Sequence, residues 1–267
     1  MKPKLIFFDI DGTIVTENGG KRVIPQSTKD TIHDLQQNGH LCFINTGRTL
    51  SEIDKTIHEL CMDGFVCGCG TYIIYHDNVI FEKTIPFSLG NRILKELEQC
   101  NLEWLLEGSH TLYYSTRPYH SHIGDFQEEH RTVFSVAFDL VAPENACNLK
   151  FDKFCICTDE TSNLLRFQNA FKDELTFIDR GSGFYEVVPS GCSKASGIQY
   201  LMDYFHIPLE DTIAIGDSTN DLPMLEFAET SIAMGGSCPQ VCEAADMVTD
   251  DILQDGLQHA FHKLGLV

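Results

Sequence analysis

The sequence has few basic residues and no long apolar run, and each shortage excludes a class of protein. Lysine and arginine number 19 against 39 aspartates and glutamates, so the formal net charge of the 267-residue chain is −20. Nucleic-acid binding depends mainly on lysine and arginine neutralising phosphates, so we expect no nucleic-acid partner. No apolar run reaches the ~18 residues of a membrane-spanning helix, so we expect no membrane association.

The chain also lacks the signals of secretion and of structural zinc. Its N-terminus has neither the long apolar region nor the small-residue cleavage site of a signal peptide, so we expect a cytoplasmic protein. The 11 cysteines include no paired C-x-x-C groups, which zinc sites commonly use. In a long chain without a leader, they favour small, buried, reduced thiols over a disulfide framework.

Strand-like and helix-like stretches alternate in the first and last thirds of the chain. Ser27 is a candidate N-cap, and Thr49 and Glu52 have the spacing of a capping box. This alternation predicts an α/β fold with a doubly wound parallel sheet. In the first third, the expected strands cover residues 4–10 and 40–47, and the expected helices cover residues 27–40 and 49–60.

The middle of the chain differs from both ends. It contains aromatic-rich, strand-like pieces such as LEWLLEG, TLYYST and KFCICTD, separated by helical stretches. This pattern predicts an α+β cap domain inserted into the core. The expected boundaries are 1–84 and 187–267 for the two parts of the core and 85–186 for the cap.

Four polar clusters follow predicted strands or begin a predicted helix. Ligands of open parallel sheets bind outside the carboxyl ends of the strands, so we expect these clusters to meet in space. They are Asp9-Ile10-Asp11-Gly12-Thr13, Thr46-Gly47-Arg48, Lys194, and the stretch from Gly216 to Asp221.

These residue types suit phosphoryl transfer. Asp9, Asp217 and the nearby Asp221 offer the hard carboxylate oxygens that Mg²⁺ prefers. Lys194 at a helix N-terminus favours an anion, and such a combination of metal and anion pocket neutralises a transferring phosphoryl group. A carboxylate nucleophile would divide hydrolysis into two steps through an aspartyl-phosphate, and a second carboxylate could donate and then accept a proton.

The stretches DIDGT, NTGR, SGCSK and GDSTND resemble, in order and spacing, the four motifs of the haloacid dehalogenase (HAD) superfamily of phosphatases. The insertion between the second and third motifs is similar to the C2-type cap of the Cof-like branch. The resemblance implies a Rossmann-like core and a Mg²⁺-dependent phosphatase. The expected substrates are small phosphorylated metabolites, with sugar phosphates favoured.

The resemblance also implies a role for each motif residue. Asp9 would be the nucleophile and a Mg²⁺ ligand; Asp11 would be the general acid and base and lend its backbone carbonyl to the metal. Asp217 would be a further metal ligand, and Asp221 would support the metal's waters or Lys194. The implied phosphate-binding residues are Ile10, Thr46, Gly47, Lys194 and Asn220, of which Thr46 and Lys194 are also counted as catalytic.

Some residues keep two interpretations. Asn45 stands where many relatives carry a small residue, which would alter the floor of the pocket. Arg48 could clamp an anion or pair with a neighbour such as Glu52. His120 and His122 are expected to pack within the cap or face the substrate rather than bind a metal, because no clear third ligand lies nearby.

The function also keeps alternatives. A phosphomutase or phosphotransferase of the same superfamily would use the same chemistry but return the phosphoryl group to an acceptor other than water. A regulator that binds a phosphorylated metabolite without turnover, or a structural adaptor, belongs to other classes. The intact set of motif acids favours an enzyme. The sequence leaves the oligomeric state open.

Overall fold

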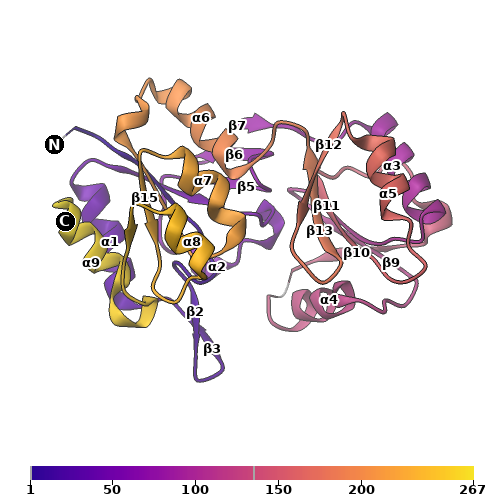
Figure 1. Cartoon of the computed structure of the whole chain (residues 1–267), viewed down its shortest axis with the longest axis horizontal. Helices are drawn as coiled ribbons and strands as arrows, with labels where there is room; N and C mark the ends of the chain where they lie inside the picture. The colour runs from indigo at the N-terminus through magenta and orange to yellow at the C-terminus, as the bar shows by residue number, and fades with distance from the viewer. Residues whose placement is uncertain (1, 135) are drawn as a thin grey trace. The chain divides into compact units, whose positions relative to one another are not determined.

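The computed structural model describes residues 2–134 and 136–267, which form two compact units (Figure 1). Unit 1 contains the N-terminal residues up to Gly47, Thr56–Ile80 and Ser193–Val267. Unit 2 contains Arg48–Lys55 and Phe81–Cys192. The domain boundaries inferred from the sequence stay a prediction. The short stretch Arg48–Lys55 groups with unit 2 although unit 1 precedes and follows it.

Unit 1 is built on a sheet in which, among the described residues, eight strands follow the order β16-β15-β14-β1-β4-β5-β6-β7. Neighbours from β16 to β5 run parallel, and β6 is antiparallel to β5. The strands are β1 (Leu5–Phe8), β4 (Leu41–Asn45), β5 (Gly64–Cys67), β6 (Tyr72–Tyr75), β7 (Asn78–Glu82), β14 (Thr212–Gly216), β15 (Thr230–Ala233) and β16 (Met247–Val248). A separate hairpin pairs β2 (Thr16–Asn18) with β3 (Lys21–Val23).

Helices cover both faces of this sheet, which confirms the predicted doubly wound fold (Figure 1). All four residues of β1 are buried, as expected for a central strand with helices on both faces. Helices α1 and α9 pack together, and α7 packs against α6 and α8. The helices are α1 (Gln26–Gln37), α2 (Lys55–His58), α6 (Lys194–Phe205), α7 (Leu222–Phe227), α8 (Pro239–Ala244) and α9 (Gly256–Leu264), with 3₁₀ turns η3 (Leu209–Asp211), η4 (Thr219–Asp221) and η5 (Ile252–Gln254).

Two local predictions are wrong. The N-cap of α1 is Pro25 rather than Ser27, because the helix already begins at Gln26 and only Pro25, with ψ of 148°, keeps a non-helical backbone. The single helix expected over residues 49–60 is divided into the 3₁₀ turn η1 (Leu50–Glu52) and the short α2. Ile53 between them has an extended backbone with ψ of 111°, which ends the first turn.

Unit 2 is an α+β unit with its own sheet, in the order β10-β9-β8-β11-β13-β12 over the described residues. The pair β9–β10 is parallel and the other neighbours are antiparallel. Its strands are β8 (Glu103–Glu107), β9 (Leu112–Ser115), β10 (Phe138–Val141), β11 (Lys153–Cys157), β12 (Leu175–Asp179) and β13 (Phe184–Pro189). Its helices are α3 (Phe87–Gln99), α4 (His122–Thr132) and α5 (Leu164–Phe171), with the 3₁₀ turn η2 (Pro143–Asn145).

The alternation of side chains along β11 divides unit 2 into two apolar layers. Phe154 and Ile156 belong to the large cluster that includes residues of α3 and α5. Cys155 and Cys157 point to the opposite face and join a smaller cluster with Ile123 of α4. Strand β11 therefore contributes to two cores.

Two further expectations from the sequence concern the state of the cysteines and the presence of membrane-spanning helices. All 11 cysteines are free thiols; seven are buried, whereas Cys61, Cys147 and Cys238 are exposed and Cys242 is intermediate. Across the part of the chain that the structure describes, none of the helices has the length and apolarity that crossing a membrane requires.

Candidate active site

The ends of three neighbouring strands of unit 1 bring the predicted clusters together. Strand β1 pairs in parallel with both β14 and β4, so the residues that follow them lie at one edge of the sheet. Asp9 continues β1 and donates its backbone N–H to the carbonyl of Ile215 at 3.0 Å. Thr46 continues β4 and donates its N–H to Val66 at 2.9 Å. Asp217 follows β14 directly.

A buried lysine joins two of the acids. The Nζ of Lys194 lies 2.6 Å from Oδ1 of Asp9 and 2.5 Å from Oδ1 of Asp221. The three side chains are at most 7% exposed, so these ion pairs are shielded from water. Lys194 is the first residue of α6, whose N-cap Ser193 accepts the N–H of Ser196. The lysine therefore lies where the helix end also favours an anion.

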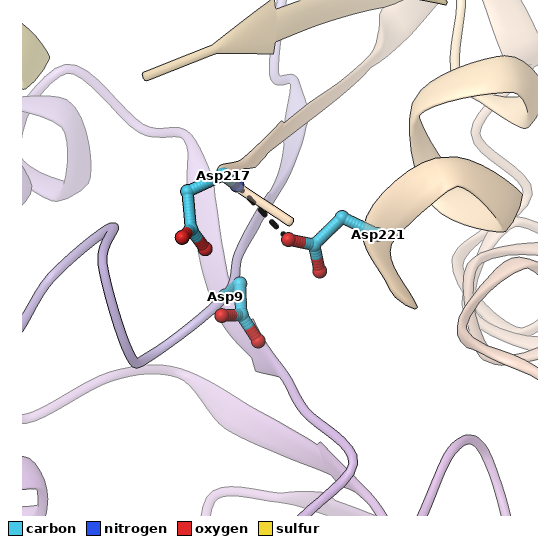
Figure 2. Close-up of side chains that lie close together, drawn as sticks. All are labelled: Asp9, Asp217 and Asp221. Atoms are coloured by element: carbon cyan, nitrogen blue, oxygen red, sulfur yellow. Dashed lines mark hydrogen bonds between the residues drawn. The ribbon is translucent and has the colours of Figure 1, made fainter. Parts of the chain in front are cut away.

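Asp221 organises the loop after β14 as well as pairing with the lysine. Its Oδ2 accepts the backbone N–H groups of Asp217 and Ser218 at 2.9 and 3.0 Å. Figure 2 shows the first of these bonds and the carboxylates of Asp9 and Asp217 beside it. Because Asp221 lies four residues after Asp217, its side chain can fold back and accept the backbone N–H of Asp217.

Glycine permits the close approach of the two loops. A Cβ on Gly12 would lie 2.3 Å from Oδ2 of Asp217, and its φ of +80° is one that other residues rarely adopt. A Cβ on Gly216 would lie 2.5 Å from Cγ of Asp221. Larger residues at either position would push the acids apart.

The electrostatics of the site are dominated by burial and by repulsion among the acids. Burial, and then the charge of Asp221, raise the pKa of Asp9 to about 7 even though Lys194 opposes the shift. The same two causes raise the pKa of Asp217 to about 6. Burial alone would lower the pKa of Lys194, but the charges of Asp221 and Asp9 outweigh it and raise that pKa. One ammonium thus faces three carboxylates, and the site has an excess of negative charge.

This donor set fits a divalent cation. One carboxylate oxygen from each of Asp9, Asp217 and Asp221 lies within 4.8 Å of the others. Oδ1 of Asp217 is buried and has no hydrogen-bond partner among the described residues, which is costly unless another group satisfies it. Oxygen-only ligands are typical of Mg²⁺ and Ca²⁺ sites. The residues present are therefore compatible with a divalent metal ion.

The structure places the other predicted residues as follows. The Asp11 side chain is 53% exposed and is not part of the carboxylate group; its Oδ1 lies 3.5 Å from Nη2 of Arg22. Ile10 is fully buried and its carbonyl accepts three backbone N–H groups of the following turn. Thr46 is buried at the end of β4. Asn220 lies in η4, where its Oδ1 accepts from the Ser218 hydroxyl. The roles of these residues stay predictions.

Sequence reasoning underestimated Asn45 and left Arg48 and the histidines open. The Nδ2 of Asn45 donates to the carbonyl of Lys194 at 2.9 Å, so it fixes the first residue of α6. Only its unusual polarity at the end of a buried strand could have indicated this. Arg48 belongs to unit 2, where its guanidinium lies 4.8 Å from the ring centre of Phe134.

The histidine pair lies in unit 2. His120 and His122 line a cavity there, and Nδ1 of His122 is 3.4 Å from Oδ2 of Asp125. Within the described residues, neither histidine belongs to a group of side chains close enough to share a metal ion.

Known proteins resemble this chain over its full length. A model of the haloacid dehalogenase-like hydrolases matches residues 6–261. "Putative phosphatase YkrA" of Bacillus subtilis is 31% identical over 267 residues, covering 100% of both chains. "5-amino-6-(5-phospho-D-ribitylamino)uracil phosphatase YcsE" of the same bacterium is 26% identical over 261 residues, covering 96% of this chain and 94% of its own.

A solved structure gives the same result. The HAD subclass IIB sugar phosphatase BT4131 matches with a TM-score of 0.83 at 26% identity, covering 99% of this chain and 100% of its own. These findings confirm the resemblance inferred from the four motifs and the fold class inferred from the alternating elements.

Proposed function

The chain belongs to the haloacid dehalogenase-like hydrolase family and is a phosphatase, and from this premise we propose how it acts and on what. It hydrolyses phosphate monoesters of small polyhydroxylated metabolites, with Mg²⁺ as cofactor and an aspartyl-phosphate formed on Asp9. The observation that carries the proposal is the Asp9 carboxylate, which is buried, 2.6 Å from the Lys194 ammonium, and grouped with Asp217 and Asp221.

In the first step, a carboxylate oxygen of Asp9 attacks phosphorus, and the bond between phosphorus and the ester oxygen breaks. Asp11 donates its proton to the departing oxygen, so the metabolite leaves as an alcohol. Lys194 pairs with the Asp9 nucleophile. Its ammonium therefore favours the ionised form of Asp9 and offsets negative charge on the phosphoryl group.

In the second step, water attacks the phosphorus of the aspartyl-phosphate. Asp11 accepts a proton from that water, the bond to the Asp9 oxygen breaks, and inorganic phosphate leaves. Asp9 and Asp217, with the backbone carbonyl of Asp11, would hold the metal. When bound, a divalent ion supplies positive charge that offsets the carboxylates and the transferring phosphoryl group.

The substrate class is supported by the two named relatives. BT4131 is a sugar phosphatase, and YcsE is named for a phosphorylated ribitylamino compound. Both leaving groups carry several hydroxyls on a short carbon chain. We propose the same class here, because the strongly acidic composition of this chain is unsuited to larger polyanions.

A panel assay tests the proposal. Purified protein is incubated with sugar phosphates, nucleotides and p-nitrophenyl phosphate, with Mg²⁺ and then with EDTA, and inorganic phosphate is measured. We expect metal-dependent release that is fastest with sugar phosphates. Isomerised sugar phosphate without release would indicate a mutase, and binding without either product would indicate a regulator.

Acid quenching tests the nucleophile. With a ³²P-labelled substrate, we expect label on the wild-type protein and none on the Asp9→Asn variant, which should also lose turnover. The exposed Asp34→Asn change on α1 is the matched control and should label normally. Normal turnover by Asp9→Asn would remove the nucleophile assignment.

A further inference from the structure

Asn45 is a fully buried polar residue inside unit 1 that has no role in the proposed mechanism. It ends β4, which lies between β1 and β5 in the parallel part of the sheet. The residue is 0% exposed. Strands that helices cover on both faces consist mainly of apolar residues, and burying an amide costs free energy unless its polar atoms are hydrogen-bonded. An asparagine at this position therefore needs an explanation.

The amide of Asn45 makes one long-range bond and keeps one atom without a partner. Its Nδ2 donates to the backbone carbonyl of Lys194, 149 positions away, at 2.9 Å. Its Oδ1 is buried and has no hydrogen-bond partner among the described residues. The cost of burying an acceptor without a partner is at least as large as the gain from one hydrogen bond. Stability therefore gives no reason to have asparagine here instead of an apolar side chain of the same shape.

The bond of Asn45 joins the two segments that supply the proposed phosphate-binding side chains. Thr46 directly follows Asn45, and Lys194 is the residue whose carbonyl accepts the bond. Lys194 is also the first residue of α6, where backbone N–H groups without a partner inside the helix favour an anion. One side chain thus links the end of β4 to the start of α6, the two halves of the proposed anion site.

Lys194 is consequently held at both of its ends. Its Nζ lies 2.6 Å from Oδ1 of Asp9 and 2.5 Å from Oδ1 of Asp221. Its backbone carbonyl accepts the bond from Asn45. A long lysine side chain can keep an ion pair while its backbone shifts, because it has several rotatable bonds. The bond from Asn45 is therefore the contact that fixes where the helix end lies relative to Thr46.

We propose that Asn45 is a positioning residue that sets Lys194 and the start of α6 relative to Thr46, so that the anion site is ordered before the phosphoryl group binds. A site that is already in its bound geometry loses less entropy on binding, so its affinity for the anion is higher. The roles of Thr46 and Lys194 in this inference rest on the proposed function. All of these residues belong to unit 1.

Asn45→Leu tests the proposal, because leucine has nearly the shape of asparagine but no polar atoms. We expect the dissociation constant of inorganic phosphate, measured by calorimetric titration in Mg²⁺-containing buffer, to rise about tenfold. The kcat/KM for p-nitrophenyl phosphate should fall by at least the same factor. The melting temperature should be no lower than that of wild type, because the substitution also removes the unpaired Oδ1. A loss of affinity without a loss of stability distinguishes positioning from a purely structural role.

Asn38→Leu is the matched control. The Nδ2 of Asn38 also donates to a distant backbone carbonyl, that of Leu266, at 2.8 Å. Asn38 precedes β4 and so lies before the end of the strand opposite to Asn45. This variant should bind phosphate like wild type. If Asn45→Leu does not fold, Asn45→Ala removes the same bond without adding bulk, and it should raise the phosphate dissociation constant in the same way.

Unchanged phosphate affinity in the Asn45 variants would overturn the proposal, whatever their melting temperatures. An equal loss of affinity in Asn38→Leu would also overturn it, because the effect would then not depend on the anion site. If wild type binds phosphate but hydrolyses no ester, the proposed function fails, and the comparison of affinities still tests Asn45. If wild type binds no phosphate, both the proposed function and the role of Asn45 are refuted.

Discussion

Replacing Asp9 by asparagine should make the metal-free protein more stable while it abolishes turnover. Burial and Asp221 raise the pKa of Asp9 from 3.8 to about 7. Because the folded pKa lies above the unfolded one, the contribution of Asp9 to stability is fully present below pH 3.8 and is lost as the pH rises through about 7. At pH 8 the ionised carboxylate therefore opposes folding, whereas a neutral amide of the same shape does not.

The expected gain in the free energy of unfolding follows from the unfolded and folded pKa values of Asp9. Each pH unit corresponds to about 1.4 kcal/mol, so the destabilisation by ionised Asp9 is about 4 kcal/mol at pH 8 and about 1–2 kcal/mol at pH 5. The stability advantage of Asp9→Asn over wild type should thus grow by about 2–3 kcal/mol from pH 5 to pH 8. Adding Mg²⁺ at pH 8 should reduce this stability advantage, because the ion would stabilise the wild type, with its ionised Asp9, more than the variant.

Urea denaturation in EDTA, followed by circular dichroism at both pH values, measures this difference. Asp34→Asn, an exposed change on α1, should show no growth with pH. The reasoning is refuted if Asp9→Asn is less stable than wild type at pH 8, or if its advantage is the same at both pH values. Either result would mean that Lys194 outweighs burial and repulsion at this carboxylate.

Other outcomes follow from the same site. Lys194→Met leaves two buried carboxylates without their cation, so it should cost about 3–5 kcal/mol in urea denaturation at pH 8; a loss below about 1 kcal/mol would contradict the buried pairing. Gly12→Ala should lower kcat/KM by about 100-fold, by analogy with the loss of a preorganised donor, because its Cβ would meet Asp217. Gly19→Ala, at φ +61° in open space, should change kcat/KM little, and equal losses would exclude the steric explanation. Asp217→Asn should raise the Mg²⁺ concentration for half-maximal activity about tenfold; an unchanged metal titration would remove Asp217 from the ligands.

Local sequence patterns predicted the alternation of strands and helices in unit 1 and the mixed strands and helices of unit 2, and the local failures have identifiable causes. The helix at Lys194 begins where the sequence predicted it, and the structure shows Ser193 as its N-cap. Such a start is predictable because capping depends only on residues within one turn. The helix expected over 49–60 is interrupted at Ile53, whose backbone is extended. Glu52, just before it, bonds back to Thr49 and also lies near His130, a partner 78 positions away. Capping-box spacing indicated the first bond, but no local pattern could indicate the second.

The candidate site also combines features that local sequence predicted with features that only the fold decided. Asp9, Asp11 and Asp217 were identified because acids directly after buried strands, in ordered motifs, have few structural explanations. The carboxylates of Asp9, Asp217 and Asp221 were expected to lie near one another, but how closely they approach depends on the backbone path of two loops. Asn45 was noted as an oddity, and its bond to the Lys194 carbonyl became visible only once β4 and α6 were placed.

The sequence by itself determined the family, the alternation of strands and helices, and which acids and lysine we propose as the catalytic set, because period, capping and motif are properties of neighbouring residues. The tertiary structure alone decided which carboxylates repel one another, which side chain fixes the start of α6, and that residues 48–55 group with unit 2. Those features arise from burial and from contacts between distant residues, and both exist only when the chain has folded.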